Sequence, residues 1–246
     1  MNIDKSEIIG ELKNAMRFYS ELGFEYLPVR IENIKDLFNE EKLLNKQKTD
    51  ALTGVKPADS IQHKSEALKL LRDEIGDCRR CKLWKHRKNI VFGEGSSNAA
   101  LMFIGEGPGR EEDIHARPFV GDAGKLLTKM IIKMGMKREG VYIANIVKCR
   151  PPSNRNPEED EIAACRPFVE KQVEIINPDV IMSLGRISSN ALTGANIPIS
   201  RLRGNFFDYR GVPLMPTFHP AYLMRNPKDK WLTWDDVQQV LAKLNT

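Results

Sequence analysis

Residues 101–127 read LMFIGEGPGREEDIHARPFVGDAGKLL, and they set the architecture that we expect for the whole chain. The stretch opens with an apolar run, Leu101 to Ile104, which predicts a buried strand. Three glycines follow at positions 105, 107 and 109, and such residues let a backbone turn sharply or approach a ligand closely. We expect a helix to begin near Ala123. In an open α/β sheet, ligands bind beyond the carboxyl ends of the strands, so this loop is a candidate active site.

The glycine loop alone has two interpretations. The segment GEGPGR lacks the third glycine of the dinucleotide-binding fingerprint G-x-G-x-x-G. The carboxylates that follow, Glu111 to Asp113, suit a phosphate site poorly because like charges repel. A strand-to-helix turn with solvated acids explains the loop equally well, so other parts of the chain have to decide its role.

Predicted strands and helices alternate from residue 60 onward. Helices are expected over residues 61–76, 123–135, 158–176, 186–192 and 229–244, and strands over 100–105, 141–147, 180–184, 206–209 and 212–215. This alternation predicts an α/β fold with a parallel sheet that is covered on both faces.

The first 59 residues differ in character from the rest. Apolar residues at helical spacing over residues 5–22 predict an amphipathic helix, and the polar run over 45–60 is typical of a linker. We therefore expect an N-terminal helical extension with its linker at residues 1–59 and a main domain at residues 60–246. The extension is a candidate for binding an unknown partner, and ordinary packing is the alternative.

Composition and charge narrow the class of protein. The chain has 246 residues, of which 41% are hydrophobic, but no apolar run approaches the roughly 18 residues of a membrane span. The N-terminal residues lack the basic and apolar regions of a secretory signal, so we expect a cytoplasmic protein. Residues 1–59 carry a formal charge of −2 and the remainder +7, which gives the +5 of the chain. A basic main domain suits contact with a polyanion.

The chain has four cysteines, and disulfides are not expected in a reducing cytoplasm. They are Cys78, Cys81, Cys149 and Cys165. Zinc commonly takes two close pairs, whereas 15 residues separate the last two cysteines here. An iron–sulfur cluster takes four thiolates without paired spacing, and neighbouring Arg and Lys residues balance its negative charge. We favour such a cluster over zinc, with buried apolar thiols as the alternative.

Two polar residues stand in apolar surroundings near predicted strand ends. Asn145 lies near the end of the strand VYIANIV, where its amide can read the acceptor and N–H of a pyrimidine edge. Satisfaction by backbone groups is the alternative. His219 lies in a loop that Pro220 stiffens, followed by the apolar residues Tyr222 to Met224. A structural role for this histidine is the alternative.

Together these motifs resemble the family-4 uracil-DNA glycosylases, the iron–sulfur-containing branch of the uracil-DNA glycosylase superfamily. The matching segments are GEGPGREED, RPFVG, NIVKCRPP, NRNPEEDEIAAC and HPAYLMR, together with all four cysteines. The resemblance spans about residues 70–244. It implies a three-layer α/β/α fold with a central, mainly parallel sheet and a 4Fe–4S cluster on the four cysteines. The implied activity is base excision repair by a monomeric, monofunctional enzyme. Such an enzyme flips uracil out of single- or double-stranded DNA and hydrolyses its N-glycosidic bond, leaving an abasic site.

The resemblance also implies roles for individual residues. Phe119 stacks on the flipped uracil, Asn145 reads its edge, and His219 contacts its O2. Near the reacting bond, the pocket is lined by Glu106, Gly107 and Glu112. DNA is contacted by Leu223, Met224 and Arg225. Some relatives have Asp or Asn at the position of Glu106, so the residue that activates water stays open.

Other activities are not expected or stand as alternatives. No basic loop is inserted after NIVKCRPP, so we expect no covalent trapping on DNA. Lys148 lacks the setting of an amine nucleophile, so we expect no lyase step. An iron–sulfur redox or electron-transfer protein would explain the cysteines but leave Asn145 and Phe119 unused. A DNA-binding module without catalysis is the third possibility, and release of free uracil distinguishes the three.

Overall fold

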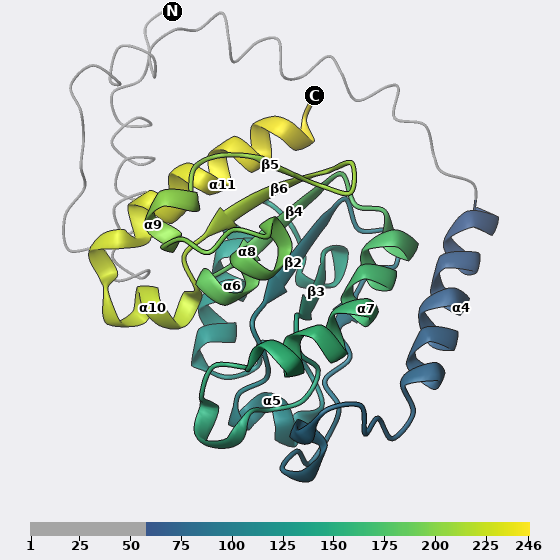
Figure 1. The fold of residues 1–246 in the computed structure, drawn as a ribbon. Coiled ribbons are helices and arrows are strands. Elements are labelled where there is room, and N and C mark those ends of the chain that lie inside the picture. The colour runs from purple at the N-terminus through teal and green to yellow at the C-terminus, as the bar shows by residue number, and fades with distance from the viewer. Residues whose placement is uncertain (1–57) are drawn as a thin grey trace, which may run out of the picture. The chain divides into compact units, whose positions relative to one another are not determined.

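A six-stranded sheet forms the centre of the computed structural model, which describes residues 58–246 (Figure 1). The strand order is β1-β3-β2-β4-β6-β5. The strands are β1 (Glu94–Gly95), β2 (Leu101–Gly105), β3 (Tyr142–Asn145), β4 (Val180–Leu184), β5 (Phe207–Tyr209) and β6 (Val212–Thr217). The inner strands β3, β2, β4 and β6 are parallel, and the edge strands β1 and β5 are antiparallel to their neighbours. The expected α/β fold with a mainly parallel sheet is confirmed.

Helices cover both faces of this sheet. The longer ones are α4 (Ala58–Ile75), α6 (Asp122–Lys133), α7 (Glu159–Ile176), α8 (Arg186–Thr193) and α11 (Lys230–Leu244). The shorter ones are α5 (Arg110–His115), α9 (Ile199–Leu202) and α10 (Pro220–Arg225), with 3-10 turns η2 (Lys82–Lys85), η3 (Arg138–Gly140), η4 (Pro152–Asn154) and η5 (Pro227–Asp229). The expected N-terminal helix over residues 5–22 lies outside the described residues.

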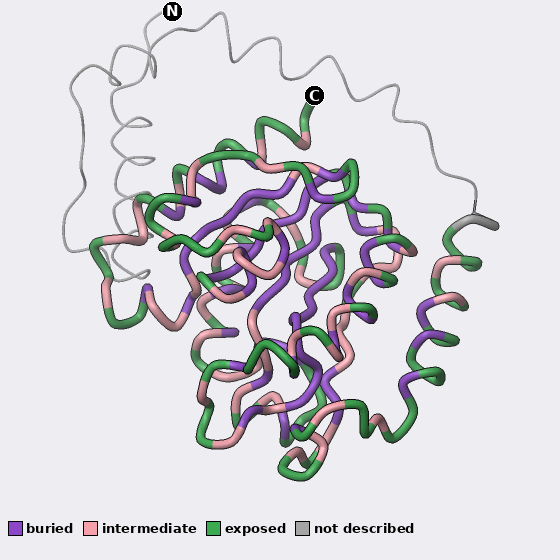
Figure 2. Tube along the Cα trace, in the orientation of Figure 1, coloured by how far each residue is buried: buried purple, intermediate pink, exposed green. Residues whose placement is uncertain are grey.

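Alternation along the strands builds two hydrophobic cores, because successive side chains point to opposite faces of a sheet. In β2, Met102 and Ile104 face one core, and Leu101 and Phe103 face the other. Helices α4, α7 and α8 complete the first core, and α6 and α11 complete the second. Figure 2 shows the strands buried between these helices. The result is a three-layer arrangement.

The order in which successive strands are added to the sheet reverses at β2. Its neighbours are β3 on one side and β4 on the other, although both follow it in the sequence. The connection from β2 to β3 runs through α6, and the connection from β3 to β4 runs through α7. Such a switch point opens a crevice beyond the carboxyl ends of the strands, where ligands bind in open α/β sheets. The loop after β2 lies at this crevice.

Several boundaries differ from those expected. The strand predicted over residues 141–147 ends at Asn145, so Cys149 lies beyond the strand and not at its end. The acidic segment after the glycines forms α5, and the Glu112 carboxylate caps its first turn by accepting a hydrogen bond from the N–H of Gly109. The segment HPAYLMR forms α10, where Pro220 occupies the first turn. No helix in the described part of the chain has the length and apolarity needed to span a membrane.

Candidate active site

A cavity of about 460 Å³ lies at the carboxyl edge of the sheet. It brings together all the residues expected at a uracil pocket: Glu106, Gly107, Glu112, Phe119, Asn145 and His219. They come from the ends of β2, β3 and β6, from α5, and from the segment between α5 and α6. Arg225, expected to contact DNA, also lines the cavity. Asn154 lines it as well, and the sequence analysis did not single that residue out.

Asn145 is the last residue of β3 and pairs in register with Gly105 of β2. It is 1% exposed, and its side-chain Oδ1 is buried without a hydrogen-bond partner in the structure. A Cβ atom on Gly105 would lie 2.4 Å from this oxygen and 2.5 Å from the Phe119 ring, so the space admits only glycine. An unpaired buried acceptor costs about 1–3 kcal/mol. The amide is therefore suited to a ligand that brings its own N–H.

Phe119 is held in an unusual backbone conformation. Its φ is +50°, in the left-handed region that bulky residues rarely adopt, at a cost of about 1–3 kcal/mol. The side chain is nevertheless 6% exposed, and its ring centroid lies 5.6 Å from that of His219. A Cβ on Gly124 would lie 1.9 Å from the Phe119 carbonyl oxygen, so the start of α6 packs directly on this residue. The surrounding contacts fix the ring at the cavity wall.

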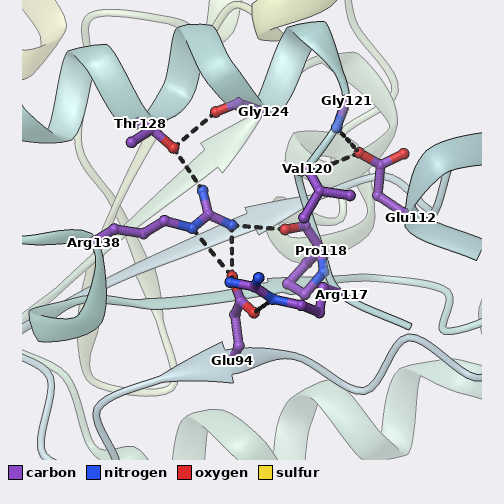
Figure 3. Close-up of polar contacts among 9 residues, drawn as sticks. All are labelled: Glu94, Glu112, Arg117, Pro118, Val120, Gly121, Gly124, Thr128 and Arg138. Carbon is purple, nitrogen blue, oxygen red and sulfur yellow. Dashed lines mark hydrogen bonds and ion pairs between the residues drawn. The ribbon is translucent and has the colours of Figure 1, made fainter. Parts of the chain in front are cut away.

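Glu112 uses both carboxylate oxygens to hold backbone. Its Oε1 accepts hydrogen bonds of 2.9 Å from the N–H groups of Val120 and Gly121, as Figure 3 shows. Its Oε2 accepts a hydrogen bond of 3.1 Å from the N–H of Gly109. The carboxylate therefore ties the glycine loop to the Phe119 segment.

The neighbouring acid has a similar role. Asp113 is 2% exposed, and its Oδ1 accepts hydrogen bonds from the N–H groups of Lys88 and Asn89. Glu111 is exposed. The interpretation of this segment as solvated acids is therefore wrong for Glu112 and Asp113, because backbone N–H groups bind both carboxylates.

Glu106 follows β2 and also lines the cavity. Unlike the Glu112 carboxylate, its carboxylate accepts no hydrogen bond from a backbone N–H group of the described residues. Within residues 58–246, no hydrogen bond or ion pair to its side chain is found. Burial raises the pKa of Glu106, and the charge of Arg186 partly opposes that rise. A half-buried carboxylate of this kind is a stronger base than one in water.

The imidazole of His219 is neutral, and its tautomer is fixed. His219 precedes α10, and its Nδ1 accepts a hydrogen bond of 3.1 Å from the N–H of Ala221. Burial lowers the pKa of His219 to about 4, and the charge of Arg225 contributes to that shift. The single proton of the neutral ring therefore resides on Nε2, which is left to donate to a ligand.

The expected DNA-contacting residues separate into buried and exposed positions. Leu223 is 4% exposed, whereas Met224 is 46% exposed and Arg225 is also exposed. Consecutive residues of a helix point in different directions, so Leu223 packs inward while Met224 and Arg225 face outward. Contact of these three residues with DNA stays a prediction.

The four cysteines line a second cavity. Cys78 and Cys81 follow α4, Cys149 follows β3, and Cys165 lies in α7. Three donors contact their sulfurs: Arg80 Nη1 at 3.4 Å from Cys78, Arg87 Nη1 at 3.4 Å from Cys149, and Lys148 N at 3.2 Å from Cys165. This set of sulfurs beside cationic side chains suits an anionic metal–thiolate group.

The arrangement and the protonation of the cysteine thiols affect how this cavity could bind a metal. Within residues 58–246, no three His, Cys, Asp or Glu side chains are arranged to hold a single metal ion. Tetrahedral zinc requires its sulfurs about 2.3 Å from one centre. Burial raises the pKa of Cys149 to about 12, so the free thiol is protonated until a metal displaces the proton. A metal group held in this cavity would bind the cysteines as thiolates.

Lys148 is buried in the interior of the domain. It is 2% exposed, and its Nζ donates to the Asn145 carbonyl oxygen at 2.9 Å and to Gln172 Oε1 at 2.6 Å. Burial lowers its pKa to about 8. The side chain links the strand end that carries Asn145 to the cysteine-bearing helix α7.

Comparisons with known proteins identify the family of the chain. Residues 92–244 match the family model of the uracil DNA glycosylase superfamily. A type-4 uracil-DNA glycosylase from Saccharolobus solfataricus is 47% identical over 188 residues, which cover 73% of this chain and 87% of that protein. The type-4 enzyme from Thermotoga maritima is 47% identical over 165 residues, covering 66% and 86%. That from Sulfurisphaera tokodaii is 43% identical over 184 residues, covering 71% and 84%. The chain therefore belongs to the uracil-DNA glycosylase superfamily.

Proposed function

We propose that the protein removes uracil from DNA by hydrolysis of the N-glycosidic bond, which releases free uracil and leaves an abasic site. The observation that carries this proposal is the buried, unpaired Oδ1 of Asn145 at a cavity that the Phe119 ring also lines. The cavity is a recess in the protein surface at the carboxyl edge of the sheet, so a base inside a duplex has to be flipped out to enter it. Flipping costs a few kcal/mol, and least for a mismatched or single-stranded base.

Asn145 supplies the discrimination between uracil and cytosine. Its Oδ1 accepts from the N3–H of uracil, and its Nδ2 donates to the O4 of uracil. Cytosine presents an acceptor at N3 and an amino donor at C4, so both hydrogen bonds would be lost. Phe119 stacks on the face of the base. The absence of a Cβ on Gly105 leaves room for the amide and the aromatic ring to lie side by side.

His219 stabilises the departing base. Cleavage places negative charge on the uracil, and the Nε2–H of a neutral His219 donates a hydrogen bond to its O2. A preorganised donor at developing charge is among the largest contributions to catalysis. Because the pKa of His219 is about 4, the imidazole stays neutral through the neutral pH range and keeps its one proton on Nε2.

Glu106 is our candidate for the carboxylate that stabilises the sugar cation and orients water. Its raised pKa and its free oxygens suit a general base. Glu112 also lines the cavity, but its oxygens bind three backbone N–H groups. We therefore assign Glu112 a positioning role and place the reacting water with Glu106.

Exposed residues beside the cavity hold the opened DNA. Arg225 lines the cavity and contacts a phosphate near the flipped nucleotide, and Met224 packs against the gap that the base leaves. Phosphate contacts by basic residues account for most affinity in such complexes. Lys148 is buried and takes no part in this contact.

We also propose that Cys78, Cys81, Cys149 and Cys165 hold a 4Fe–4S cluster. When bound, the cluster would join the segments after α4 and β3 to α7 covalently through iron, and its role is structural. Support comes from the four sulfurs around one cavity and from the cationic groups of Arg80 and Arg87 beside them. Free thiols and such a cluster suit a reducing cytoplasm, where we place the protein. A redox carrier would leave the Asn145 cavity without a role.

Two further assignments belong to this proposal. We expect a monomeric enzyme whose catalytic domain comprises residues 60–246. Residues 1–59 stay a candidate segment for binding a partner, and the division at residue 59 stays a prediction.

The direct test is release of free uracil from single- and double-stranded oligonucleotides that contain one uracil. The wild-type protein should release uracil and leave an alkali-labile abasic site without cutting the strand itself. Asn145→Ala should bind the same DNA but release uracil far more slowly. Binding without release by the wild-type protein would favour a DNA-binding module and refute the proposal.

A further inference from the structure

Arg138 in η3 contacts three parts of the chain around the Phe119 segment (Figure 3). Its Nη2 donates to the Pro118 carbonyl oxygen at 2.7 Å and to Glu94 Oε1 at 2.7 Å. Its Nε donates to the same Glu94 oxygen at 3.1 Å, and its Nη1 donates to Thr128 Oγ1 at 2.9 Å. The guanidinium is thus engaged through all three of its nitrogens. Its side chain is 14% exposed, and Glu94 neutralises its charge, so it is poorly placed to bind a phosphate.

These contacts hold the backbone that precedes Phe119, and Glu112 holds the backbone that follows it. Arg138 holds the carbonyl of Pro118, the residue before Phe119. Glu112 holds the N–H groups of Val120 and Gly121, the residues after it. The left-handed backbone of Phe119 therefore lies between two charged anchors. Such a conformation persists where the surroundings over-determine it.

A second path leads from Arg138 to the same residue. Thr128 accepts from Arg138 and donates through Oγ1 to the Gly124 carbonyl oxygen at 3.0 Å. Gly124 in turn packs on the carbonyl of Phe119. The guanidinium thus fixes the first turns of α6 together with the segment that precedes the helix.

We propose that Arg138, oriented by Glu94, is a positioning residue for uracil excision that acts through Phe119. It does not line the cavity, and it holds the Phe119 ring where the flipped base stacks. Without it, the backbone of Phe119 relaxes toward negative φ, and the ring leaves its place beside Asn145 and His219. This inference rests on the proposed function, because the stacked base is uracil.

The chain offers a matched control for this arginine. Arg117 also donates to Glu94, at 2.7 Å from Nε to Oε2, but its side chain is 60% exposed. None of the contacts found for Arg117 reaches the Pro118 carbonyl. Arg117→Met therefore removes a guanidinium from the same carboxylate and leaves the anchor on the Phe119 segment intact.

The test compares Arg138→Met, Arg138→Lys and Arg117→Met by single-turnover excision, DNA affinity and inhibition by free uracil. A misplaced contact of this kind slows reaction by about 10- to 100-fold, which we expect for Arg138→Met. Inhibition by free uracil should weaken in parallel, while DNA affinity stays within about 2-fold because phosphate contacts persist. Arg138→Lys should fall between, since one amine cannot reach all three partners. Arg117→Met should behave as the wild type.

A double-mutant cycle separates positioning from general destabilisation. In a Phe119→Ala background, Arg138→Met should cause no further loss of rate, because the residue acts through the missing ring. Losses that multiply would overturn the inference, as would a normal rate in the single variant. If Arg138→Met does not fold, the same double-mutant cycle with Phe119→Ala is measured for Arg138→Lys and for Glu94→Gln. Failure of the wild-type protein to release uracil would instead refute the proposed function.

Discussion

The ring of Phe119 lies 5.6 Å from the imidazole of His219, centroid to centroid, with an angle of 33° between the two planes. Phe119 belongs to the segment between α5 and α6, and His219 follows β6. Phe119 comes after β2 and His219 after β6, and β4 lies between these two strands in the sheet. The fold therefore places a stacking surface and a neutral hydrogen-bond donor on the wall of one cavity.

The donor role of His219 predicts different outcomes for two substitutions. His219→Ala should slow single-turnover excision by a factor on the order of 10²–10³, because a donor aimed at developing charge is lost. His219→Gln should retain more activity, since its terminal amide nitrogen reaches about as far as Nε2. Rapid-quench measurement of uracil release gives both rates. Equal rates for the two variants would contradict donation from Nε2, and loss of DNA binding with a normal rate would make His219 a structural residue.

The raised pKa of Glu106 predicts the acidic side of the pH profile. The carboxylate acts when it is deprotonated, so the rate should fall as pH decreases through a pKa above the ordinary value for glutamate. Protonation of His219 occurs near pH 4 and should affect the rate only at more acidic pH. Glu106→Gln should be slow and should lack the Glu106 limb of the profile. An unchanged profile in this variant would assign the titration to another group.

Glu112 should matter for stability as well as rate. Glu112→Gln replaces one of two acceptor oxygens by a donor and leaves at least one backbone N–H unpaired. The expected loss is about 2 kcal/mol, which lowers the melting temperature by about 4–8 °C. Glu111→Gln is the control, because that side chain is exposed. Equal melting temperatures for the two variants would contradict the bracing role.

The cysteine cavity predicts iron in the purified protein. Anaerobically prepared protein should be brown and contain about four iron atoms per chain. Cys149→Ser should lose iron and stability, because this buried sulfur joins the segment after β3 to the cluster. Metal analysis by mass spectrometry gives the stoichiometry. One zinc atom and no iron would contradict the assignment.

The alternation of apolar runs and helical spacings was enough to predict the sheet, its main helices and its parallel character. Asn145 was predicted near a strand end, and the observed strand ends at this residue, two positions before the predicted end. The inward-facing residues of α4, Leu68, Leu71 and Ile75, follow from helical spacing alone. These features depend on local pattern.

Other features depend on tertiary contacts that no local pattern encodes. The left-handed backbone of Phe119 results from anchors on Pro118, Val120 and Gly121 that come from distant segments. The burial of Leu223 beside the exposed Met224 also follows from how α10 packs after His219. The different roles of Glu106 and Glu112 likewise follow from which backbone N–H groups lie nearby.

The central claim is that the Asn145 amide reads uracil, and the excision rates of Asn145→Asp test it most directly. A carboxylate cannot donate to O4 and repels it, whereas it accepts from the amino group of cytosine. Loss of one such hydrogen bond costs about 1–3 kcal/mol, so uracil excision should slow by at least about 5-fold, up to about 150-fold. Single-turnover assays on matched uracil and cytosine oligonucleotides should show this loss together with a gain of weak cytosine excision. Uracil excision at the wild-type rate, with cytosine left intact, would contradict the claim.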